Sequence, residues 1–350
     1  MTGTRLRPTP LEATATPRVS VVIPCYNYGE YLRACVESVL TQPGVDVDVT
    51  IVDDASTDDS VAVAEQMMAE SDRVALIRHE TNRGHIQTFN DALAAATADF
   101  VVKMDADDIV PEGALARAVA LLAAQPQLAF VYGHPHTFVT DPPADLATEV
   151  RDWTVWDGEE WAGAILDRAH NVIMQPEVVM RRSALEEVGG HREEVPEASD
   201  LNLWLRLASA GGVGRVNGPV QGLYRVHAKS MQRTVHAGFL SDLNGRVAAI
   251  ELFFAERGAT LRDATGLQRR FRRAMALDAV GLARRAQDLG RADVEPIAEY
   301  LQTARTLDPH IIETRQWRAA NRRSSASRPR AAIRGLDDRL RWRKWRRTGL

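Results

Sequence analysis

The chain has 350 residues, of which 45% are hydrophobic and 26% charged, and its formal net charge is −4. These values are ordinary for a globular protein with a buried core, so they exclude collagen-like and largely disordered chains. No apolar run reaches the roughly 18 to 20 residues of a membrane-spanning helix, and residues 1–17 contain no hydrophobic signal core. The two cysteines, Cys25 and Cys35, suit neither a disulfide scaffold nor a zinc site. We therefore expect a protein of the reducing cytoplasm.

Strands alternate with helices over about residues 18–125. The preceding residues 1–17 are rich in proline and threonine and are predicted to be a disordered leader. Strands are predicted at residues 19–23, 47–52, 74–78 and 100–102, and helices at residues 31–40, 59–70, 86–96 and 111–124. This alternation predicts an α/β fold with a mostly parallel sheet, right-handed crossovers and helices on its faces.

The second half of the chain has a less regular pattern. Further strands are predicted at residues 128–132 and 220–227, helices at 184–188 and 201–210, a long loop near a binding cleft at 134–161, and a helical region from about 236 onward. The predicted loop contains Trp153, Trp156 and Trp161, which suit either a platform for an acceptor sugar or buried anchors. Burial is the favoured interpretation because tryptophan is mostly buried in folded proteins.

Acidic and polar residues follow the predicted strands of the first half. In an open α/β sheet, ligands bind beyond the carboxyl ends of the strands, so these residues should lie at one edge. Asp105 and Asp107 offer the hard oxygen ligands that Mg²⁺ or Mn²⁺ prefers, and a metal there would neutralise a diphosphate. Tyr26 suits stacking on a base, and Asp54 suits accepting a ring N–H. Taken alone, however, residues 53–56 are better explained as a turn followed by a helix cap.

The order and spacing of four segments are more specific than any one of them. The segments are residues 19–27, 51–58, 82–84 and 103–108. Together they resemble the large family 2 of inverting glycosyltransferases with the GT-A fold, a Rossmann-like, mostly parallel sheet flanked by helices. The implied domains are a GT-A domain at 18–232, with a nucleotide-binding half at 18–125 and an acceptor half at 126–232, a helical C-terminal extension at 233–314 and a basic tail at 315–350.

The resemblance also implies functional residues. The implied nucleotide-binding residues are Pro24, Tyr26, Asn27, Asp53, Asp54, Arg83, Asp105 and Arg225. The implied ligands of Mn²⁺ or Mg²⁺ are Asp105, Asp107 and His227. Within these sets, we expect Asp54 to contact the base and Asp107 to be the most direct metal ligand. A packed or solvated histidine explains His227 equally well, and a cap for the following turn explains Asp108 equally well.

The catalytic base is expected in residues 197–206, an acidic segment that leads into a helix. By resemblance, Asp200 would accept the proton of the acceptor hydroxyl as that oxygen attacks the anomeric carbon opposite the leaving diphosphate. The metal and Arg225 would stabilise the departing nucleoside diphosphate. Ser199 stands where many family members have a second acid. The structural alternative for Asp200 is a plain helix N-cap.

The resemblance therefore implies metal-dependent transfer of a sugar from a nucleoside-diphosphate sugar, with a UDP-sugar favoured. The acceptor is unknown, and cell-envelope polysaccharide, glycolipid and natural-product glycosylation are the expected settings. One alternative is a nucleotidyltransferase on a related sheet, but residues 24–29 lack the basic, glycine-rich phosphate loop of such enzymes. The other is a catalytically silent protein that binds sugar nucleotides, against which the presence of Asp105, Asp107 and Asp200 counts.

The tail differs in charge from the rest of the chain. Residues 315–350 contain 13 Lys and Arg and two Asp, a net charge of +11, which leaves −15 for residues 1–314. Tryptophan alternates with arginine in residues 339–347. We expect this segment to lie on an anionic membrane surface, at the inner face of the membrane, with a solvated tail as the alternative. A nucleic-acid partner is not expected, and a homo-oligomer stays open.

Overall fold

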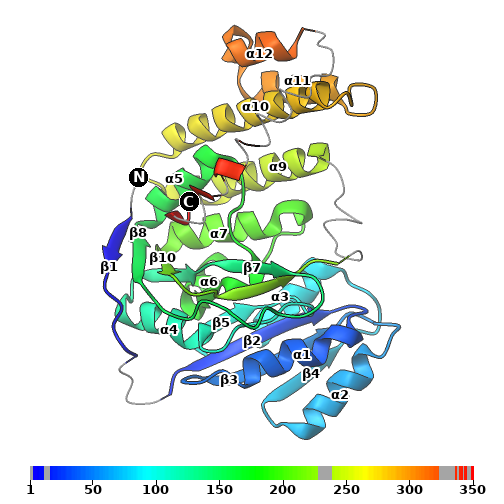
Figure 1. Cartoon of the computed structure of the whole chain (residues 1–350), viewed down its shortest axis with the longest axis vertical. Coiled ribbons are helices and arrows are strands. Elements are labelled where there is room, and N and C mark those ends of the chain that lie inside the picture. Colours follow the sequence, from blue (N-terminus) through cyan, green and yellow to red (C-terminus); the bar gives the residue numbers. More distant parts are fainter. Residues whose placement is uncertain are drawn as a thin grey trace. The chain divides into compact units, whose positions relative to one another are not determined.

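The structure is a computed structural model that describes residues 3–11, 16–227 and 239–322, together with residues 336, 339–341, 343, 344 and 348–350. The chain forms two compact units (Figure 1). The first unit consists of Met1–Trp161 and Ile173–Ser230, and the second of Ala162–Val172 and Met231–Leu350. Among the described residues, no helix is both long enough and apolar enough to cross a membrane.

A nine-stranded sheet forms the centre of the first unit, in the order β1-β8-β10-β6-β9-β5-β2-β3-β4. Its strands are β1 (Thr4–Leu6), β2 (Arg18–Cys25), β3 (Asp46–Asp53), β4 (Val74–Arg78), β5 (Phe100–Lys103), β6 (Leu128–Tyr132), β8 (Asp152–Trp156), β9 (Val179–Arg181) and β10 (Gly212–Asn217). Strand β2 pairs in parallel with β3 and β5, and β3 pairs in parallel with β4. A separate parallel pair is formed by β7 (Pro135–Phe138) and β11 (Gly222–Arg225).

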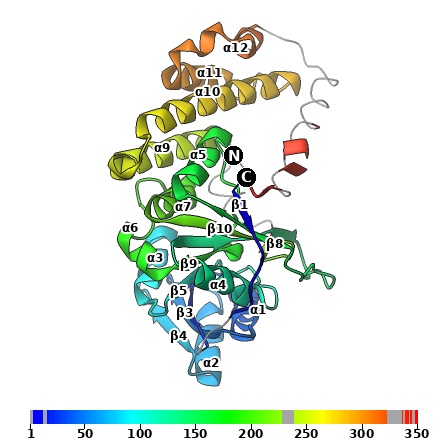
Figure 2. The ribbon, with the colours of Figure 1, turned by 90° about the vertical axis from the view of Figure 1, so that its left-hand side faces the viewer.

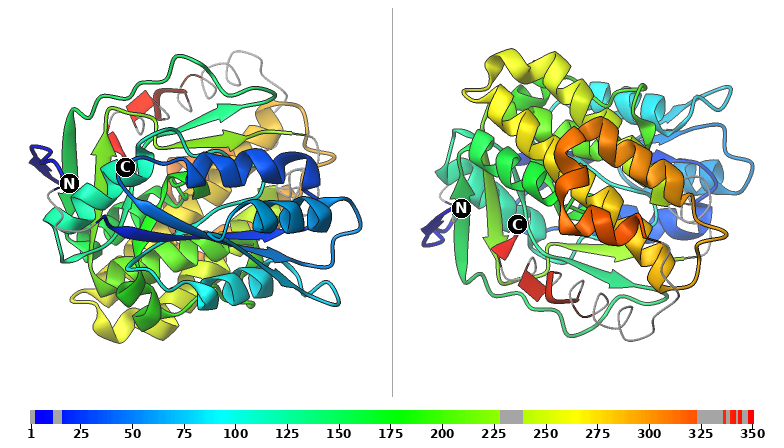
Figure 3. Two further views of the ribbon diagram at one scale, coloured as in Figure 1. Left: turned by 90° about the horizontal axis from the view of Figure 1, so that it is seen from below. Right: turned by 90° about the horizontal axis from the view of Figure 1, so that it is seen from above.

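Helices cover both faces of this sheet (Figures 2 and 3). They are α1 (Gly29–Leu40), α2 (Ser60–Glu70), α3 (His85–Ala95), α4 (Ala114–Ala124), α6 (Arg182–Val188) and α7 (Ser199–Ala210), with the short 3₁₀ turns η1 (Gln175–Glu177) and η2 (Pro196–Ala198). Alternate residues of β2, such as Val21 and Ile23, share one core with the apolar sides of α1, α2 and α4. Helix α3 packs on the other face of β2 and β3. The predicted α/β fold class with helices on both faces of the sheet is confirmed.

Two segments differ from the sequence-based expectations. Within the leader, Thr4–Leu6 forms β1, which pairs antiparallel with β8 and so covers the outer edge of that strand. The predicted loop at 134–161 instead contains β7, β8 and the start of α5 (Gly158–Arg168). Its three tryptophans are buried, so the core interpretation holds and the acceptor platform does not. The segments that form β7 and β8 were missed because their apolar runs are too short and too interrupted to indicate strands.

The second unit is helical. Besides residues 162–172, it contains α9 (Phe239–Arg257), α10 (Ala264–Asp288), α11 (Ile297–Leu307) and α12 (Arg315–Ala320), with the 3₁₀ turns η3 (Gly258–Thr260) and η4 (Pro309–Glu313). Buried Arg246 donates to the carboxylates of Asp242 and Asp278, which compensates its charge inside the unit. Because α12 packs on α10 through buried Trp317, the first six residues of the expected tail belong to this folded unit. Most of the Arg-Trp segment at 339–347 is charged and exposed where described, and its two tryptophans lie outside the described residues.

Candidate active site

The strand register brings the polar loops to one edge of the sheet. Pro24 and Cys25 lie beside Val52 and Asp53, so the loops after β2 and β3 leave the sheet together. At the next strand on the β3 side, Arg78 at the end of β4 pairs with Asp53. At the next strand on the β2 side, Lys103 at the end of β5 pairs with Val22. The carboxyl ends of four parallel strands therefore meet at one site, as expected for ligand binding in an open α/β sheet.

The loop after β2 is tied to the loop after β3 through Asn27. The Asn27 side-chain oxygen accepts from the backbone N–H of Thr57 at 2.7 Å, and the Asn27 N–H donates to Oγ of Ser56 at 2.9 Å. Asn27 has a φ of 60°, a left-handed conformation that asparagine tolerates better than most residues. In this structure Asn27 thus shapes the loop, whereas neighbouring Tyr26 is 45% exposed and open to stacking.

Asp53 is buried at the end of β3. Its Oδ2 accepts from the backbone N–H of Ser56 at 3.0 Å. Its Oδ1 has no hydrogen-bond partner among the described residues, although the atom is inaccessible to solvent. A buried carboxylate oxygen without a partner is costly, so this atom is a candidate acceptor for a ligand N–H.

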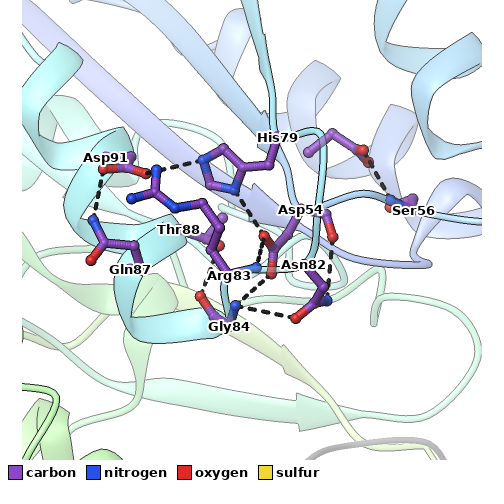
Figure 4. Close-up of polar contacts among 10 residues, drawn as sticks. Asp54, Ser56, His79, Asn82, Arg83, Gly84, Gln87, Thr88 and Asp91 are labelled. Atoms are coloured by element: carbon purple, nitrogen blue, oxygen red, sulfur yellow. Dashed lines mark hydrogen bonds and ion pairs between the residues drawn. The ribbon is translucent and has the colours of Figure 1, made fainter.

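Asp54 is also buried, and its oxygens are already occupied (Figure 4). Oδ1 accepts from the backbone N–H of Arg83 at 2.7 Å and contacts Nδ1 of His79 at 2.8 Å, while Oδ2 accepts from the N–H of Gly84 at 2.9 Å. Burial alone would raise the pKa of Asp54, but these hydrogen bonds lower it below its usual value. Asp54 therefore fixes the loop at 82–84 directly.

Arg83 and Asp91 complete this group of side chains. Nη1 of Arg83 lies 2.5 Å from Oδ2 of Asp91 on α3, and Nε2 of His79 lies 3.0 Å from the same oxygen. Sequence reasoning named Asp54 and Arg83 but missed His79 and Asp91. The available signal for His79 was its position directly after β4, at the same edge as the other polar loops.

The acidic segment after β5 separates into different environments. Oδ2 of Asp107 lies 2.8 Å from Nε2 of His227. Asp108 is fully buried, and its Oδ1 accepts from the backbone N–H of Arg225 at 2.8 Å. Asp108 therefore ties β11 to the β5 loop, a structural contact that differs from the predicted cap of the next turn.

The donors around Asp107 fit a divalent cation. A carboxylate oxygen and an imidazole nitrogen are suitable ligands for Mn²⁺. Burial, together with the negative charge of Asp107, raises the pKa of nearby Asp105 despite the opposing effect of Lys103, and a cation would relieve that cost. Within the described part of the chain, no group of three or more His, Cys, Asp or Glu residues forms a ready-made metal site. Asp107 and His227 are thus brought together as predicted, and Asp105 lies in the same acidic segment.

Arg225 is placed beside this segment, and its contacts are with protein atoms. Its guanidinium lies 4.7 Å from the ring centre of Tyr31 and 4.3 Å from that of Phe138. Nε donates to the backbone oxygen of Asp107 at 2.9 Å, and Nη1 donates to that of Thr140 at 2.7 Å. These contacts position the main chain of Asp107. The sequence-based expectation was instead that Arg225 contacts a diphosphate.

Asp200 lies in the first turn of α7, and its side chain is 34% exposed. The N-cap of that helix is Ala198, so the N-cap alternative for Asp200 is wrong. Oδ1 of Asp200 lies 2.9 Å from Nζ of Lys103 and 3.8 Å from Nδ1 of His191. Burial would raise the pKa of Asp200, but Lys103 and His191 lower it to about 2, so the carboxylate is charged at neutral pH.

Lys103 and His191 form the buried side of this carboxylate site. Lys103 is only 4% exposed, and its Nζ lies 3.5 Å from the ring centre of Phe89. The imidazole of His191 stacks on the same ring, and burial lowers its pKa to about 3, so it is neutral. Sequence reasoning missed both residues. A lysine inside an apolar strand was the available signal, because buried lysines are rare unless paired.

The chain is similar in sequence to known glycosyltransferases. The sequence pattern described as "Glycosyl transferase family 2" matches residues 20–189. The putative glycosyltransferase EpsE of Bacillus subtilis (strain 168) is 30% identical over 203 residues, which cover 56% of this chain and 68% of EpsE. Chondroitin synthase of Escherichia coli is 28% identical over 201 residues, which cover 57% of this chain but only 28% of that protein.

A solved structure shares the fold. S. aureus TarS 1-349 in complex with UDP-GlcNAc superimposes with a TM-score of 0.54 at 16% sequence identity, covering 85% of this chain and 92% of that one. At this identity the likeness concerns the fold alone. The chain spans less than a third of the length of the E. coli chondroitin synthase, so the activity of that whole protein does not transfer with the match.

Proposed function

The chain belongs to glycosyltransferase family 2 and has the GT-A fold, and on this premise we propose that it is an inverting, metal-dependent enzyme that uses a nucleoside-diphosphate sugar. The observation that carries the proposal is the position of Asp200. This charged, partly exposed carboxylate is held by Lys103, a residue of the same strand end that carries Asp105 and Asp107. The residues proposed as the base and as the cation-binding segment thus lie near one another at one edge of the sheet.

The donor is proposed to be a UDP-sugar. Tyr26 is exposed for stacking, and Oδ1 of Asp53, which has no partner among the described residues, offers a carboxylate acceptor for a base with a ring N–H, such as uracil. Asp54 would support this contact by holding the neighbouring loop at 82–84. The complex of TarS with UDP-GlcNAc supports a nucleotide-sugar donor for this fold. The nucleotide would lie against the loops after β2, β3 and β4.

In the proposed reaction, Asp200 accepts the proton of the acceptor hydroxyl as its oxygen attacks the anomeric carbon. The bond from that carbon to the diphosphate oxygen breaks on the opposite face, and its electron pair leaves with the nucleoside diphosphate. A divalent cation at Asp107, His227 and Asp105 would supply positive charge against that leaving group. Arg225 keeps the main chain of Asp107 in place.

A thermal-shift screen tests the donor site first. UDP, GDP and their sugars are added with and without Mn²⁺ to the wild type, Asp107→Ala and the exposed control Asp145→Ala. A ligand that binds only the folded state raises the melting temperature by mass action. We expect a Mn²⁺-dependent rise with one base, lost in Asp107→Ala and kept in the control. The absence of a shift with every nucleotide would contradict the donor site.

The His227→Ala variant tests the metal site in the same screen. We expect weaker Mn²⁺ dependence, because the imidazole lies 2.8 Å from Asp107 and would share the cation. Unchanged affinity for Mn²⁺ would reject His227 as a ligand. Turnover of a bound sugar nucleotide then separates an enzyme from a silent binding protein, since the silent protein would bind the donor without releasing the nucleotide.

The basic tail is proposed to bring the enzyme to an anionic membrane surface from the cytoplasmic side. Each basic residue near such a surface is worth about 1 kcal/mol, and residues 339–347 contain several. Because α12 belongs to the folded second unit, the right comparison is the full chain against a version that ends at Arg322. Co-sedimentation with phosphatidylserine vesicles should be lost in the shortened version. Equal binding by both would contradict the proposal.

A further inference from the structure

His79 lies between two carboxylates that hold the same loop (Figure 4). Its Nδ1 is 2.8 Å from Oδ1 of Asp54, and its Nε2 is 3.0 Å from Oδ2 of Asp91. A charged carboxylate can only accept, so Nδ1 carries the proton in the contact with Asp54. The side chain of His79 is 6% exposed, which means that water does not replace these contacts.

The loop between the two carboxylates is Asn82–Gly84. Its backbone N–H groups, from Arg83 and Gly84, donate to Asp54 at 2.7 and 2.9 Å. The side chain of Arg83 extends from this loop to α3, where its Nη1 donates to Oδ2 of Asp91 at 2.5 Å. The main chain is therefore held by the inner carboxylate and the side chain by the outer one, and His79 contacts both.

We propose that His79 is a positioning residue of the nucleotide site, which orients Asp54 through the Nδ1 contact so that the loop at 82–84 is set against the bound base. This inference rests on the proposed function, because it requires that the loops after β2, β3 and β4 hold the nucleotide. His79 itself does not have to contact the nucleotide. It acts by fixing Asp54, the acceptor that holds the main chain of the loop.

The placement of His79 supports this role over general packing. It follows directly on β4, the edge strand of the sheet, and its ring joins the end of β3 to α3. The loop is also tied to Asp54 through Asn82, whose side-chain amide donates to the backbone oxygen of Asp54 at 3.3 Å. Removing the imidazole takes one donor from Asp54 and one contact from Asp91 while leaving the sheet intact. The first effect should be a looser loop.

The experiment compares His79→Leu, which removes both contacts, with His79→Asn, which keeps one N–H donor on the side facing Asp54. His310→Asn is the matched control, because His310 is 83% exposed. Three quantities are measured: the dissociation constant of UDP or GDP, whichever the wild type binds, the amide exchange of a peptide containing Arg83 and Gly84, and the melting temperature without ligand.

We expect His79→Leu to weaken nucleotide binding about tenfold, equivalent to ~1.4 kcal/mol, and to speed amide exchange at Arg83 and Gly84. His79→Asn should restore much of the amide protection, and His310→Asn should match the wild type. If the leucine variant does not fold, His79→Ala gives the same readout. A merely structural role would lower the melting temperature without a selective change in exchange at the loop.

Two results would overturn the inference while leaving the proposed function intact. One is binding by His79→Leu within twofold of the wild type with unchanged exchange at the loop. The other is weaker binding with unchanged exchange, which would make His79 a direct ligand contact. If the wild type binds neither UDP nor GDP, the proposed donor site and the inference both fail.

Discussion

The ammonium group of Lys103 lies 2.9 Å from Oδ1 of Asp200. The two residues are 97 positions apart, one at the end of β5 and the other in the first turn of α7. The contact keeps Asp200 charged and fixes one of its oxygens, while the side chain stays 34% exposed and accessible to an acceptor hydroxyl. It also makes Asp200 a weak base before the reaction, so proton transfer should accompany attack of the acceptor oxygen rather than precede it.

Replacing Asp200 by Asn should remove catalysis but preserve donor binding. General-base catalysis contributes about 10²–10⁴-fold, and the amide cannot accept the proton. We therefore expect UDP release from whichever UDP-sugar the wild type turns over to fall by about that factor, while the dissociation constant of UDP changes less than twofold. Asp145→Asn is the exposed control. Near-normal turnover in Asp200→Asn would remove the base assignment.

A double-mutant cycle should reveal the Lys103–Asp200 pair. Lys103→Met removes the buried cation and leaves Asp200 without its main partner, so the free energy of unfolding should fall by about 1–3 kcal/mol. In the double variant with Asp200→Asn, the loss should be smaller than the sum of the two single losses, because no unpaired charge remains. Urea unfolding measures all four proteins. Strictly additive losses would mean that the contact contributes nothing.

The strand–helix alternation and the position of the site could be predicted from the sequence. Runs such as residues 19–23 are apolar enough to be buried on both faces, and parallel strands bring their following loops to one edge. This is why Asp54, Asp107 and Arg83 could be proposed as candidates for one edge of the sheet before their positions were known. The periodicity of apolar residues and the position of a loop after a strand are local properties, so they can be inferred from the sequence alone.

The contacts made by those residues could not be predicted in the same way. Strand β9 lies between β5 and β6 and pairs antiparallel with both, although it comes much later in the chain. No local sequence pattern encodes that strand order. The Lys103–Asp200 contact depends on where α7 meets β5. Likewise, Asp54 and Arg83 were predicted as separate ligand contacts, whereas the structure bonds one to the other. Such pairings follow from tertiary packing, which outweighs local preference.

Glu177 should make stability depend on pH. Burial raises its pKa to about 8, in spite of hydrogen bonds from backbone N–H groups and the nearby charge of Arg215, which lower it. The folded state then holds a proton that the unfolded state releases above about pH 4.3. This contribution to stability is full below that pH and is lost as the pH rises through about 8.

The matching variant is Glu177→Gln, which does not titrate. Relative to the wild type, its free energy of unfolding should rise by up to about 1.4 kcal/mol per pH unit between pH 5 and 8. The exposed control Glu193→Gln should show no such trend. Chemical denaturation at several pH values measures the difference, and a constant difference between pH 5 and 8 would show that Glu177 is ionised in the folded protein.

Two glycines should respond in opposite directions to replacement by alanine. A Cβ on Gly158 would overlap the backbone oxygens of Ala208 and Gly211, which cannot move without disturbing the end of α7, so we expect a loss of about 1–3 kcal/mol. A Cβ on Gly281, inside α10, meets no atom of the described residues within 4 Å apart from the backbone of its own helix turn, and alanine favours the helix by about 0.5–1 kcal/mol. Thermal unfolding of the two variants measures both effects. A neutral Gly158→Ala would mean that α5 and the turn after α7 are less closely packed than the structure requires, while a destabilising Gly281→Ala would mean that the open side of α10 is covered in the folded protein.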